Sequence, residues 1–406
     1  MFRLLLRGMN GIFAIEKPSG ISSSNFLGEL QAIFTKSSVF HQDLIDARNK
    51  TIKALSTDKK WLKQKIDKKV KNLKVKIGHG GTLDPLASGV LVVGIGNGTK
   101  KLQYYLGECN KTYETKALLG ISTTTGDSEG EIITKNKTDH ITRDLIESIA
   151  YRFVGDLQQT PPIFSALKMN GKALYDYARE GIPLPKPIKL RKVKIHDIKV
   201  HEEDTLSRLH QFASLESQLD ENGVPKEHQL ARNPTLNDSS LFFSDQYLER
   251  AEVEGLPKEP VDPFLLEEGE LLPEKLPLIH FTTDVSSGTY IRSLVSDIGR
   301  GLGSSAYMVE LIRVKQSDWE LGKNVFKILD FKDRNEKVWG PVLKKVLDNG
   351  SDVNVDLEFK LLTGKLSLSS NEKEIIEEQK VEVEVSEDLQ RDANESEEPK
   401  TKKIRL

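Results

Sequence analysis

Apolar positions follow two different periods along the chain. Continuous or alternating apolar runs predict strands over residues 11–16, 90–95, 111–120 and 193–200. Apolar residues three or four positions apart predict helices over residues 26–33, 145–153, 171–181 and 293–302. Glycine, proline and serine separate most of these segments, as is typical of turns. The chain therefore combines strands and helices.

A lysine-rich segment at residues 35–76 interrupts this pattern. Thirteen Lys or Arg and only four Asp lie between residues 35 and 77. The apolar residues that recur there at helical spacing are Leu62, Ile66, Val70 and Leu73. This spacing predicts a helix. Its basic side chains include Lys63, Lys65, Lys68 and Lys69. Two interpretations stay open: a solvated helix packed by one apolar stripe, or a clamp on RNA phosphates.

The rest of the chain divides by composition. Residues 203–275 are polar and acidic, and we expect a flexible insertion there. Residues 10–330 are expected to form one domain that carries both insertions, followed by a C-terminal extension at residues 331–370. The Glu-rich tail at residues 371–406 ends in a basic cluster and is expected to be disordered.

Composition excludes several classes of protein. The 406 residues include 59 Lys or Arg and 61 Asp or Glu, and no apolar run approaches the ~18 residues of a membrane span. The single Cys109 excludes an internal disulfide framework and a cysteine-based metal cluster. The leader at residues 1–9 contains two arginines, and residues 399–405 form a basic cluster. These ends are compatible with a mitochondrial and a nuclear location, although a leader that simply enters the first strand fits equally well.

One carboxylate, that of Asp84, lies in a glycine-rich turn before an apolar strand. The turn reads Gly78-His79-Gly80-Gly81-Thr82-Leu83-Asp84-Pro85-Leu86-Ala87-Ser88-Gly89. Glycine permits backbone geometry closed to other residues, and Pro85 fixes the dihedral after the acid. The turn is therefore predicted to hold Asp84 rigidly. Taken alone, Asp84 before proline also fits a simple turn-capping role.

The same stretch resembles the catalytic signature of the TruB family of pseudouridine synthases, Gly-His-x-Gly-Thr-Leu-Asp-Pro-Leu-Ala-Ser/Thr-Gly-Val-Leu. Four other segments resemble family motifs: Lys17-Pro18-x-Gly20-x-Ser22-Ser23, Lys111-x-Tyr113, residues 171–181, and Gly288-Thr289-Tyr290-Ile291-Arg292. The segment Leu311-Ile312-Arg313 resembles the family's Leu-Arg-Arg element, with Ile312 in place of the first arginine. The resemblance covers residues 10–329 outside the two insertions, and no PUA domain is expected after it.

This resemblance implies a fold and a set of roles. The fold would be α+β, a pseudouridine synthase catalytic core with a mixed, mainly antiparallel sheet flanked by helices. Asp84 would be the nucleophile, paired with Arg292, and Tyr113 would assist at the uracil ring. The residues expected to contact the substrate are His79, Tyr290, Leu311 and Lys17. The sequence does not choose between attack on the sugar carbon, attack on the ring carbon, and a glycal route.

The resemblance also implies the substrate. We expect uridine 55 in the T loop of tRNA, with T-loop-like mRNA hairpins as further substrates, and no cofactor, because isomerisation needs no redox change. The protein is expected to act as a monomer, without a membrane or an obligate protein partner. A tRNA-folding chaperone and a guide-dependent synthase of ribosomal or small nucleolar RNA stay open as alternatives. The glycine-rich residues 94–100 lack Walker and Gly-x-Gly-x-x-Gly spacing, which argues against nucleotide binding.

Overall fold

The computed structural model describes residues 8–57, 62–213, 215–216 and 233–364. The first seven residues of the expected leader, the acidic tail and its basic end lie outside these ranges. No helix within the described ranges is long and apolar enough to cross a lipid bilayer.

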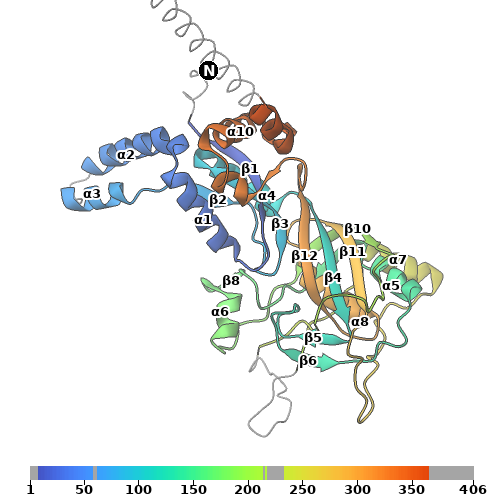
Figure 1. The fold of residues 1–406 in the computed structure, drawn as a ribbon. Coiled ribbons are helices and arrows are strands. Elements are labelled where there is room, and N and C mark those ends of the chain that lie inside the picture. The colour runs from blue at the N-terminus through green and yellow to red at the C-terminus, as the bar shows by residue number, and fades with distance from the viewer. Residues whose placement is uncertain (1–7, 58–61, 214, 217–232, 365–406) are drawn as a thin grey trace, which may run out of the picture.

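One ten-stranded sheet is the frame of the molecule (Figure 1). Eight strands follow the order β14-β1-β3-β12-β4-β11-β10-β7, with β2 paired to β3 and β13 paired to β12. The strands are β1 (Gly11–Lys17), β2 (Ile77–His79), β3 (Ser88–Ile95), β4 (Lys111–Leu119), β7 (Gly155–Gln159), β10 (Arg191–Val200), β11 (Leu278–Val285), β12 (Ala306–Gln316), β13 (Trp319–Glu320) and β14 (Val325–Phe326). Among the described pairs, only β1 with β14 and β12 with β3 are parallel. The mixed, mainly antiparallel sheet predicted from the family resemblance is confirmed.

The centre of this sheet determines where the Asp84 turn lies. Every residue of β3 after Ser88 is buried, which explains why its sequence is continuously apolar and not alternating. β12 runs parallel to β3 only where Ile312 and Arg313 meet Ser88 and Gly89. The Asp84 turn, which directly precedes β3, is therefore fixed at the junction of three sheet segments, β2, β3 and β12.

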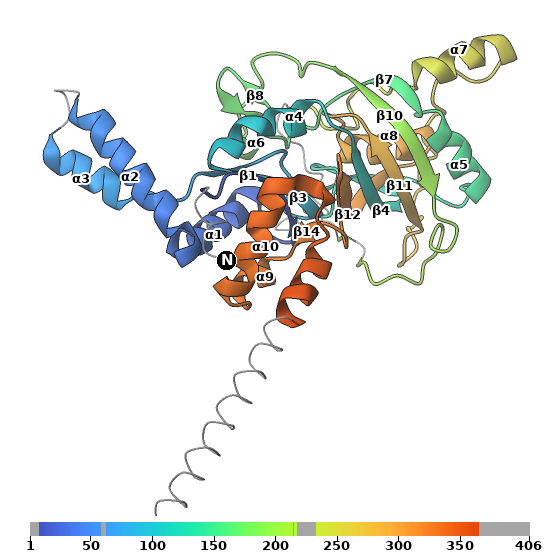
Figure 2. The same ribbon diagram turned by 90° about the horizontal axis from the view of Figure 1, so that it is seen from above.

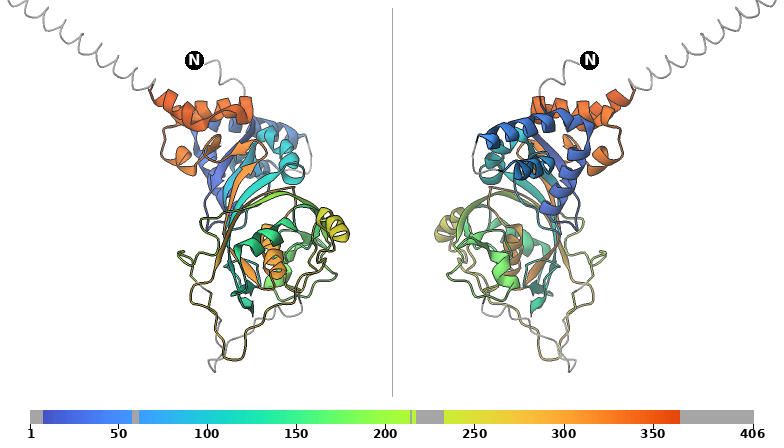
Figure 3. Two further views of the ribbon diagram at one scale, coloured as in Figure 1. Left: turned by 90° about the vertical axis from the view of Figure 1, so that its right-hand side faces the viewer. Right: turned by 90° about the vertical axis from the view of Figure 1, so that its left-hand side faces the viewer.

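Helices cover the sheet in two groups, each with its own core. The helices outside the insertions are α1 (Ser23–Lys36), α4 (Leu102–Gly107), α5 (Arg143–Tyr151), α6 (Leu174–Arg179), α8 (Ile291–Gly301), α9 (Ile328–Lys332) and α10 (Glu336–Asn349). One core joins α1, α9 and α10 to β1 and β3, and the other joins α5 and α8 to β4, β11 and β12. Figure 3 shows the two groups at opposite ends of the molecule. The Asp84 turn lies where the two cores meet, since Leu83 and Ala87 belong to the second core and Val90 to the first.

Two short ribbons lie beside the sheet. One pairs β5 (Ile121–Thr123) with β6 (Ile132–Lys135), and the other pairs β8 (Lys168–Met169) with β9 (Lys172–Ala173). The helix predicted over residues 171–181 is shorter than expected, because β9 takes its first residues and α6 begins at Leu174. Gly181 follows the C-cap residue Glu180 and has a φ of +64°, which is typical of a glycine that ends a helix.

The described part of the C-terminal extension belongs to the first core. Trp339, Leu343 and Val346 on α10 are fully buried. The Trp339 ring packs edge-on to Phe331 at 5.3 Å and stacks with Phe34 at 6.0 Å. Aromatic contacts of this kind join the C-terminal extension to α1.

The lysine-rich insertion forms a helical hairpin of α2 (His41–Ser56) and α3 (Lys63–Lys71). Ile66 is buried and Val70 partly buried, as the helical spacing predicts. Leu62 differs, because it precedes α3 as its N-cap residue and is 66% exposed. Figures 1 and 2 show the hairpin projecting from the same side of the sheet as α6.

The acidic insertion corrects one expectation. We expected residues 203–275 to be flexible, yet their described part contains α7 (Asp245–Glu254), which packs beside β7. Phe243, Tyr247 and Ala251 are buried in the second core. Residues 217–232 of this insertion lie outside the described ranges. Isolated aromatic residues in polar sequence supply this packing, and they produce no periodic signal.

Candidate active site

The Asp84 turn is held from both sides by the segment that links β1 to α1. The Ser23 hydroxyl donates to the Leu83 carbonyl at 2.8 Å and accepts the Leu83 backbone N–H at 2.9 Å. On the other side of Asp84, the Gly20 N–H donates to the Pro85 carbonyl at 2.8 Å. All of these bonds use backbone atoms of the turn. The Asp84 side chain takes no part in holding the turn, and it remains 35% exposed.

Two positions in the turn require glycine. Gly81 and Gly89 have φ values of +132° and +104°, in the region that disfavours other residues. A Cβ atom at Gly89 would lie only 2.3 Å from the Arg313 carbonyl oxygen. Glycine therefore allows the turn to approach β12 closely enough for the strands to pair there.

Arg292 pairs with Asp84 across the fold. It lies in the first turn of α8, and its Nη2 is 2.9 Å from Asp84 Oδ2. Its side chain is 4% exposed, and it also donates to the carbonyls of Thr125 and Phe164, each at 2.7 Å. These bonds fix the guanidinium in one orientation, so that one N–H remains directed at the Asp84 carboxylate.

Two further acids lie beside this pair. Asp127 Oδ2 is 3.7 Å from Arg292 Nε, and Asp127 is buried. Burial raises the pKa of Glu129, and the nearby charges of Asp127 and Asp84 raise it further. We did not single out these acids from the sequence. The sequence signal for them is the acidic Gly126-Asp127-Ser128-Glu129-Gly130 segment.

Both candidate tyrosines lie close to these groups. Tyr113 on β4 is buried in the second core together with Leu83 of the turn and Leu311 of β12. Tyr290 precedes α8, and its backbone N–H donates to Gln159 Oε1 at 2.8 Å. Burial raises the pKa of the Tyr290 phenol, and the charge of Asp84 contributes to the same shift. Tyr290 therefore stays protonated at neutral pH.

Lys17 turns inward to the backbone of the site. Its Nζ donates to the carbonyls of Pro18 at 2.8 Å, Ile21 at 2.6 Å and Pro85 at 3.4 Å, and the residue is fully buried. Burial lowers its pKa to about 8, while the negative charge of Asp84 opposes this shift. In this geometry Lys17 supports the turn, and its amine is already occupied by backbone carbonyls.

His79 begins the turn on β2. Burial and the positive charge of Arg313 lower its pKa, so the ring is neutral at physiological pH. Its Nδ1 is buried and has no hydrogen-bond partner among the described residues. The ring is thus packed into the protein beside the backbone of Gly81.

Arg313 is a residue of the site whose role we did not predict. It is almost fully buried on β12, where its Nε donates to the Val90 carbonyl at 2.6 Å and its Nη2 to the Gly81 carbonyl at 3.2 Å. Arg313 therefore connects β12 to both ends of the turn. The family's Leu-Arg-Arg element pointed to this position, but sequence alone gave no sign of which backbone groups it would bind.

The four candidate lysines of α3 do not join the site. All four are exposed on the projecting hairpin, as Figure 1 shows for the helix that carries them. They are Lys63, Lys65, Lys68 and Lys69. Any contact they make with a substrate involves a part of it distant from Asp84.

Comparison with known proteins shows that the chain is a pseudouridine synthase, an isomerase. A family model described as "TruB family pseudouridylate synthase (N terminal domain)" matches residues 64–217. The chain is 51% identical over 362 residues to "tRNA pseudouridine synthase 4" of Saccharomyces cerevisiae, which covers 87% of this chain and 88% of that protein. Identity to "tRNA pseudouridine synthase 4" of Schizosaccharomyces pombe is 37% over 358 residues, 81% of this chain and 84% of that protein.

The chain is also similar in sequence to a bacterial tRNA pseudouridine synthase. Identity to "tRNA pseudouridine synthase B" of Parabacteroides distasonis is 31% over 273 residues, 67% of this chain and 85% of that protein. The chain belongs to the TruB family of pseudouridine synthases.

Proposed function

We propose that this enzyme converts uridine 55 in the T loop of tRNA to pseudouridine. The observation that carries the proposal is the rigid turn that presents Asp84 to the Arg292 guanidinium at 2.9 Å. The substrate is inferred from the relatives in yeasts and bacteria, which are named as tRNA pseudouridine synthases. RNA loops are suitable targets, because their bases can be flipped out for chemistry.

The reaction is an isomerisation that the residues of the site can support. The bond from N1 of uracil to C1′ of ribose breaks, the base rotates, and C5 bonds to C1′ while C5 loses a proton and N1 gains one. We propose that Asp84 acts as the nucleophile and that Arg292 orients its carboxylate. Tyr113 and Leu311 would bound the uracil on the side of the buried core, and Tyr290 would bound it next to α8.

The remaining candidate residues have supporting roles in this proposal. His79, whose lowered pKa keeps its ring neutral, would lie next to the space left by the flipped nucleotide. The four exposed lysines of α3 would contact phosphates of the tRNA outside the T loop, since their hairpin extends the protein beyond the catalytic sheet. T-loop-like mRNA hairpins present the same shape and would be further substrates.

Release of tritium tests the proposal directly. Unmodified tRNA carrying C5-tritiated uridine is incubated with the purified protein in the absence of guide RNA, and the modified position is then mapped. We expect release by the wild type, mapped to position 55, and none by Asp84→Asn. Tight tRNA binding without release would instead favour the chaperone or the guide-dependent enzyme, and release mapped outside the T loop would refute the assigned substrate site.

A further inference from the structure

The acidic insertion returns to the core next to the active site. Residues 235–239 form a compact turn there. Asp238 Oδ2 accepts hydrogen bonds from the backbone N–H and the hydroxyl of Thr235, both at 2.8 Å. The Ser239 hydroxyl donates to the Leu236 carbonyl at 2.6 Å. The turn is thus shaped by its own hydrogen bonds, which is typical of Asp and Ser in tight turns.

Leu236 backs the loop that holds Arg292. Gly126 has a φ of +78°, and a Cβ atom there would lie 2.8 Å from Leu236 Cδ1 and 3.4 Å from Arg292 Cβ. Gly126 is therefore packed between Leu236 and the arginine. The preceding residue, Thr125, is the one whose carbonyl accepts the Arg292 Nη1 bond at 2.7 Å. Leu236 therefore packs against the residue that follows this carbonyl.

Asn237 fixes the base of the same loop. Its Nδ2 donates to Ser122 Oγ at 2.8 Å and to Thr134 Oγ1 at 3.2 Å. These two residues are register partners in the β5–β6 ribbon. The loop that joins these two strands, residues 124–131, carries Asp127. One asparagine side chain therefore joins both strands that support the acidic neighbour of Arg292.

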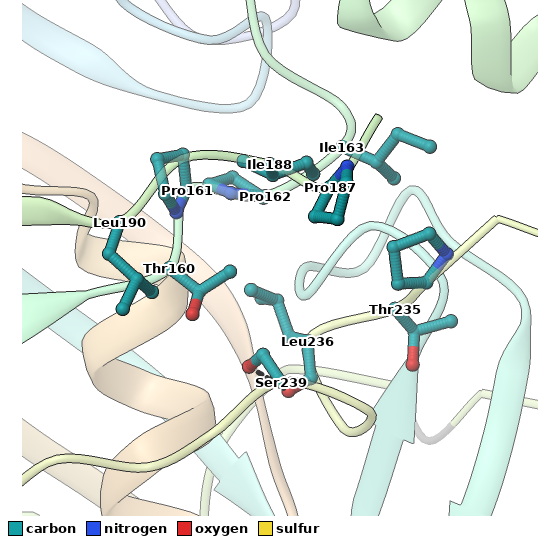
Figure 4. Close-up of a pocket in the computed structure, with 11 residues that line it drawn as sticks. Thr160, Pro161, Pro162, Ile163, Pro187, Ile188, Leu190, Thr235, Leu236 and Ser239 are labelled. Carbon is teal, nitrogen blue, oxygen red and sulfur yellow. Dashed lines mark hydrogen bonds between the residues drawn. The ribbon is translucent and has the colours of Figure 1, made fainter. Parts of the chain in front are cut away.

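The turn is also tied to α8. Arg300 Nη1, near the end of α8, donates to the Ser239 carbonyl at 2.6 Å. On its other side, Leu236 borders a hollow of about 160 Å³ together with Thr160 and Pro162 (Figure 4). The turn thus spans both structures that fix Arg292, the helix and the loop, and the hollow leaves room for a longer side chain at Leu236.

We infer that residues 235–239 are a positioning element of the active site, in which Leu236 and Asn237 aim Arg292 at Asp84. They act through the loop at residues 124–131 and not by contact with the substrate. The inference rests on the proposed synthase function for its kinetic test. It assigns a role to an insertion whose composition predicted only a flexible connection.

The test compares variants of the full-length protein. Leu236→Ala and Asn237→Ala remove the two contacts, and Leu236→Met keeps the apolar contact by using the adjoining hollow. Leu248→Ala is the matched control, because it truncates a leucine of the same insertion on α7, beside β7. We measure the single-turnover rate of tritium release, the Kd for tRNA and the unfolding temperature.

We expect Leu236→Ala and Asn237→Ala to reduce the single-turnover rate about 10- to 100-fold, since small misplacements of a catalytic group have effects of this size. Kd should not change, Leu236→Met should recover most of the rate, and Leu248→Ala should lower the unfolding temperature without affecting the rate. Normal rates in both alanine variants would overturn the inference. An equal loss of rate in Leu248→Ala would also overturn it, because the effect would then be general destabilisation.

A second readout does not depend on activity. The Nε–H resonance of Arg292 in nitrogen-15 arginine-labelled protein, assigned by its absence in Arg292→Lys, should shift in Asn237→Ala and not in Leu248→Ala. Asn237→Ala also serves if Leu236→Ala does not fold. A wild type that releases no tritium would refute the proposed function, while this resonance would still decide the role of the turn. An unshifted resonance in Asn237→Ala would refute the positioning role.

Discussion

Replacement of Asp84 by asparagine should separate the chemistry of the site from its architecture. Asparagine has nearly the same shape as aspartate, but it is uncharged and carries an NH2 group in place of one carboxylate oxygen. The hydrogen bonds that hold the turn are made by backbone atoms of Leu83 and Pro85, and by the Ala87 N–H, which donates to the Asp84 carbonyl at 3.1 Å. None of them depends on the Asp84 side chain. We therefore expect Asp84→Asn to fold with the turn intact.

The expected loss of stability follows from the surroundings of the ion pair. Exposed ion pairs contribute ~0 to 1 kcal/mol, whereas breaking a fully buried pair costs about 3 to 5 kcal/mol. Here Arg292 is 4% exposed and Asp84 is 35% exposed. Arg292 also keeps its bonds to the Thr125 and Phe164 carbonyls. The pair lies between the two cases, so the free energy of unfolding should fall by about 1 to 2 kcal/mol.

The catalytic effect should be much larger. Loss of the proposed nucleophile should slow single-turnover tritium release at least ~10³-fold, equivalent to about 4 kcal/mol of activation free energy. The Kd for tRNA should stay close to that of the wild type. Asp156→Asn is the matched control, because it removes a half-exposed carboxylate from an ion pair with Lys194 at 3.2 Å on edge strand β7. A rate loss under about tenfold, or a loss of tRNA binding with unfolding, would show that Asp84 is structural.

Three other predictions test separate parts of the structure. Substitution of the four α3 lysines by glutamine should weaken tRNA binding and lower the slope of log K against log salt by about 3, because each phosphate contact contributes ~0.7 to 0.9; an unchanged slope would exclude the clamp. The pKa of Lys17 is about 8 in the folded protein and 10.5 in the unfolded protein. Between pH 8 and pH 10.5 the unfolded state therefore binds more protons at Lys17 than the folded state does. The contribution of Lys17 to the free energy of unfolding should consequently increase with pH over this range. Chemical unfolding of wild type and Lys17→Met from pH 7 to about 10 checks this, and a constant difference between the two would contradict it. Gly89→Ala should lower the free energy of unfolding by about 2 to 4 kcal/mol, because its Cβ would meet the Arg313 carbonyl at a positive φ; a normal unfolding temperature would show that β12 can move away.

The candidate site was predictable where its residues lie in continuous motifs. Asp84 and Arg292 each stand in a motif long enough to identify, and the structure brings them within 2.9 Å. Gly89 was predicted to have backbone freedom, and its φ of +104° agrees. The role of Arg313 was not predictable in the same way, because its partners are backbone carbonyls of a distant segment and carry no sequence signal.

Burial and long-range contact were the limits of sequence analysis. Lys17 was expected to meet the substrate, but whether a lysine at the end of a strand faces solvent or backbone depends on what packs over it. The acidic insertion was expected to be flexible because it lacks apolar periodicity, yet Phe243 and Tyr247 anchor it in the second core. Single large side chains contribute substantial burial without forming a pattern.

The sequence by itself determined the local structure of this protein and the chemical identity of its site. Periodicity decides helix or strand, and glycine and proline decide the shape of a turn, because both act between residues close in the chain. Only the tertiary structure decided that Arg292 is held by Thr125 and Phe164, that Lys17 turns inward, and that residues 235–239 reach the active site. These contacts join segments far apart in sequence. Their geometry follows from the order of strands in the sheet and from the packing around it, which no local pattern specifies.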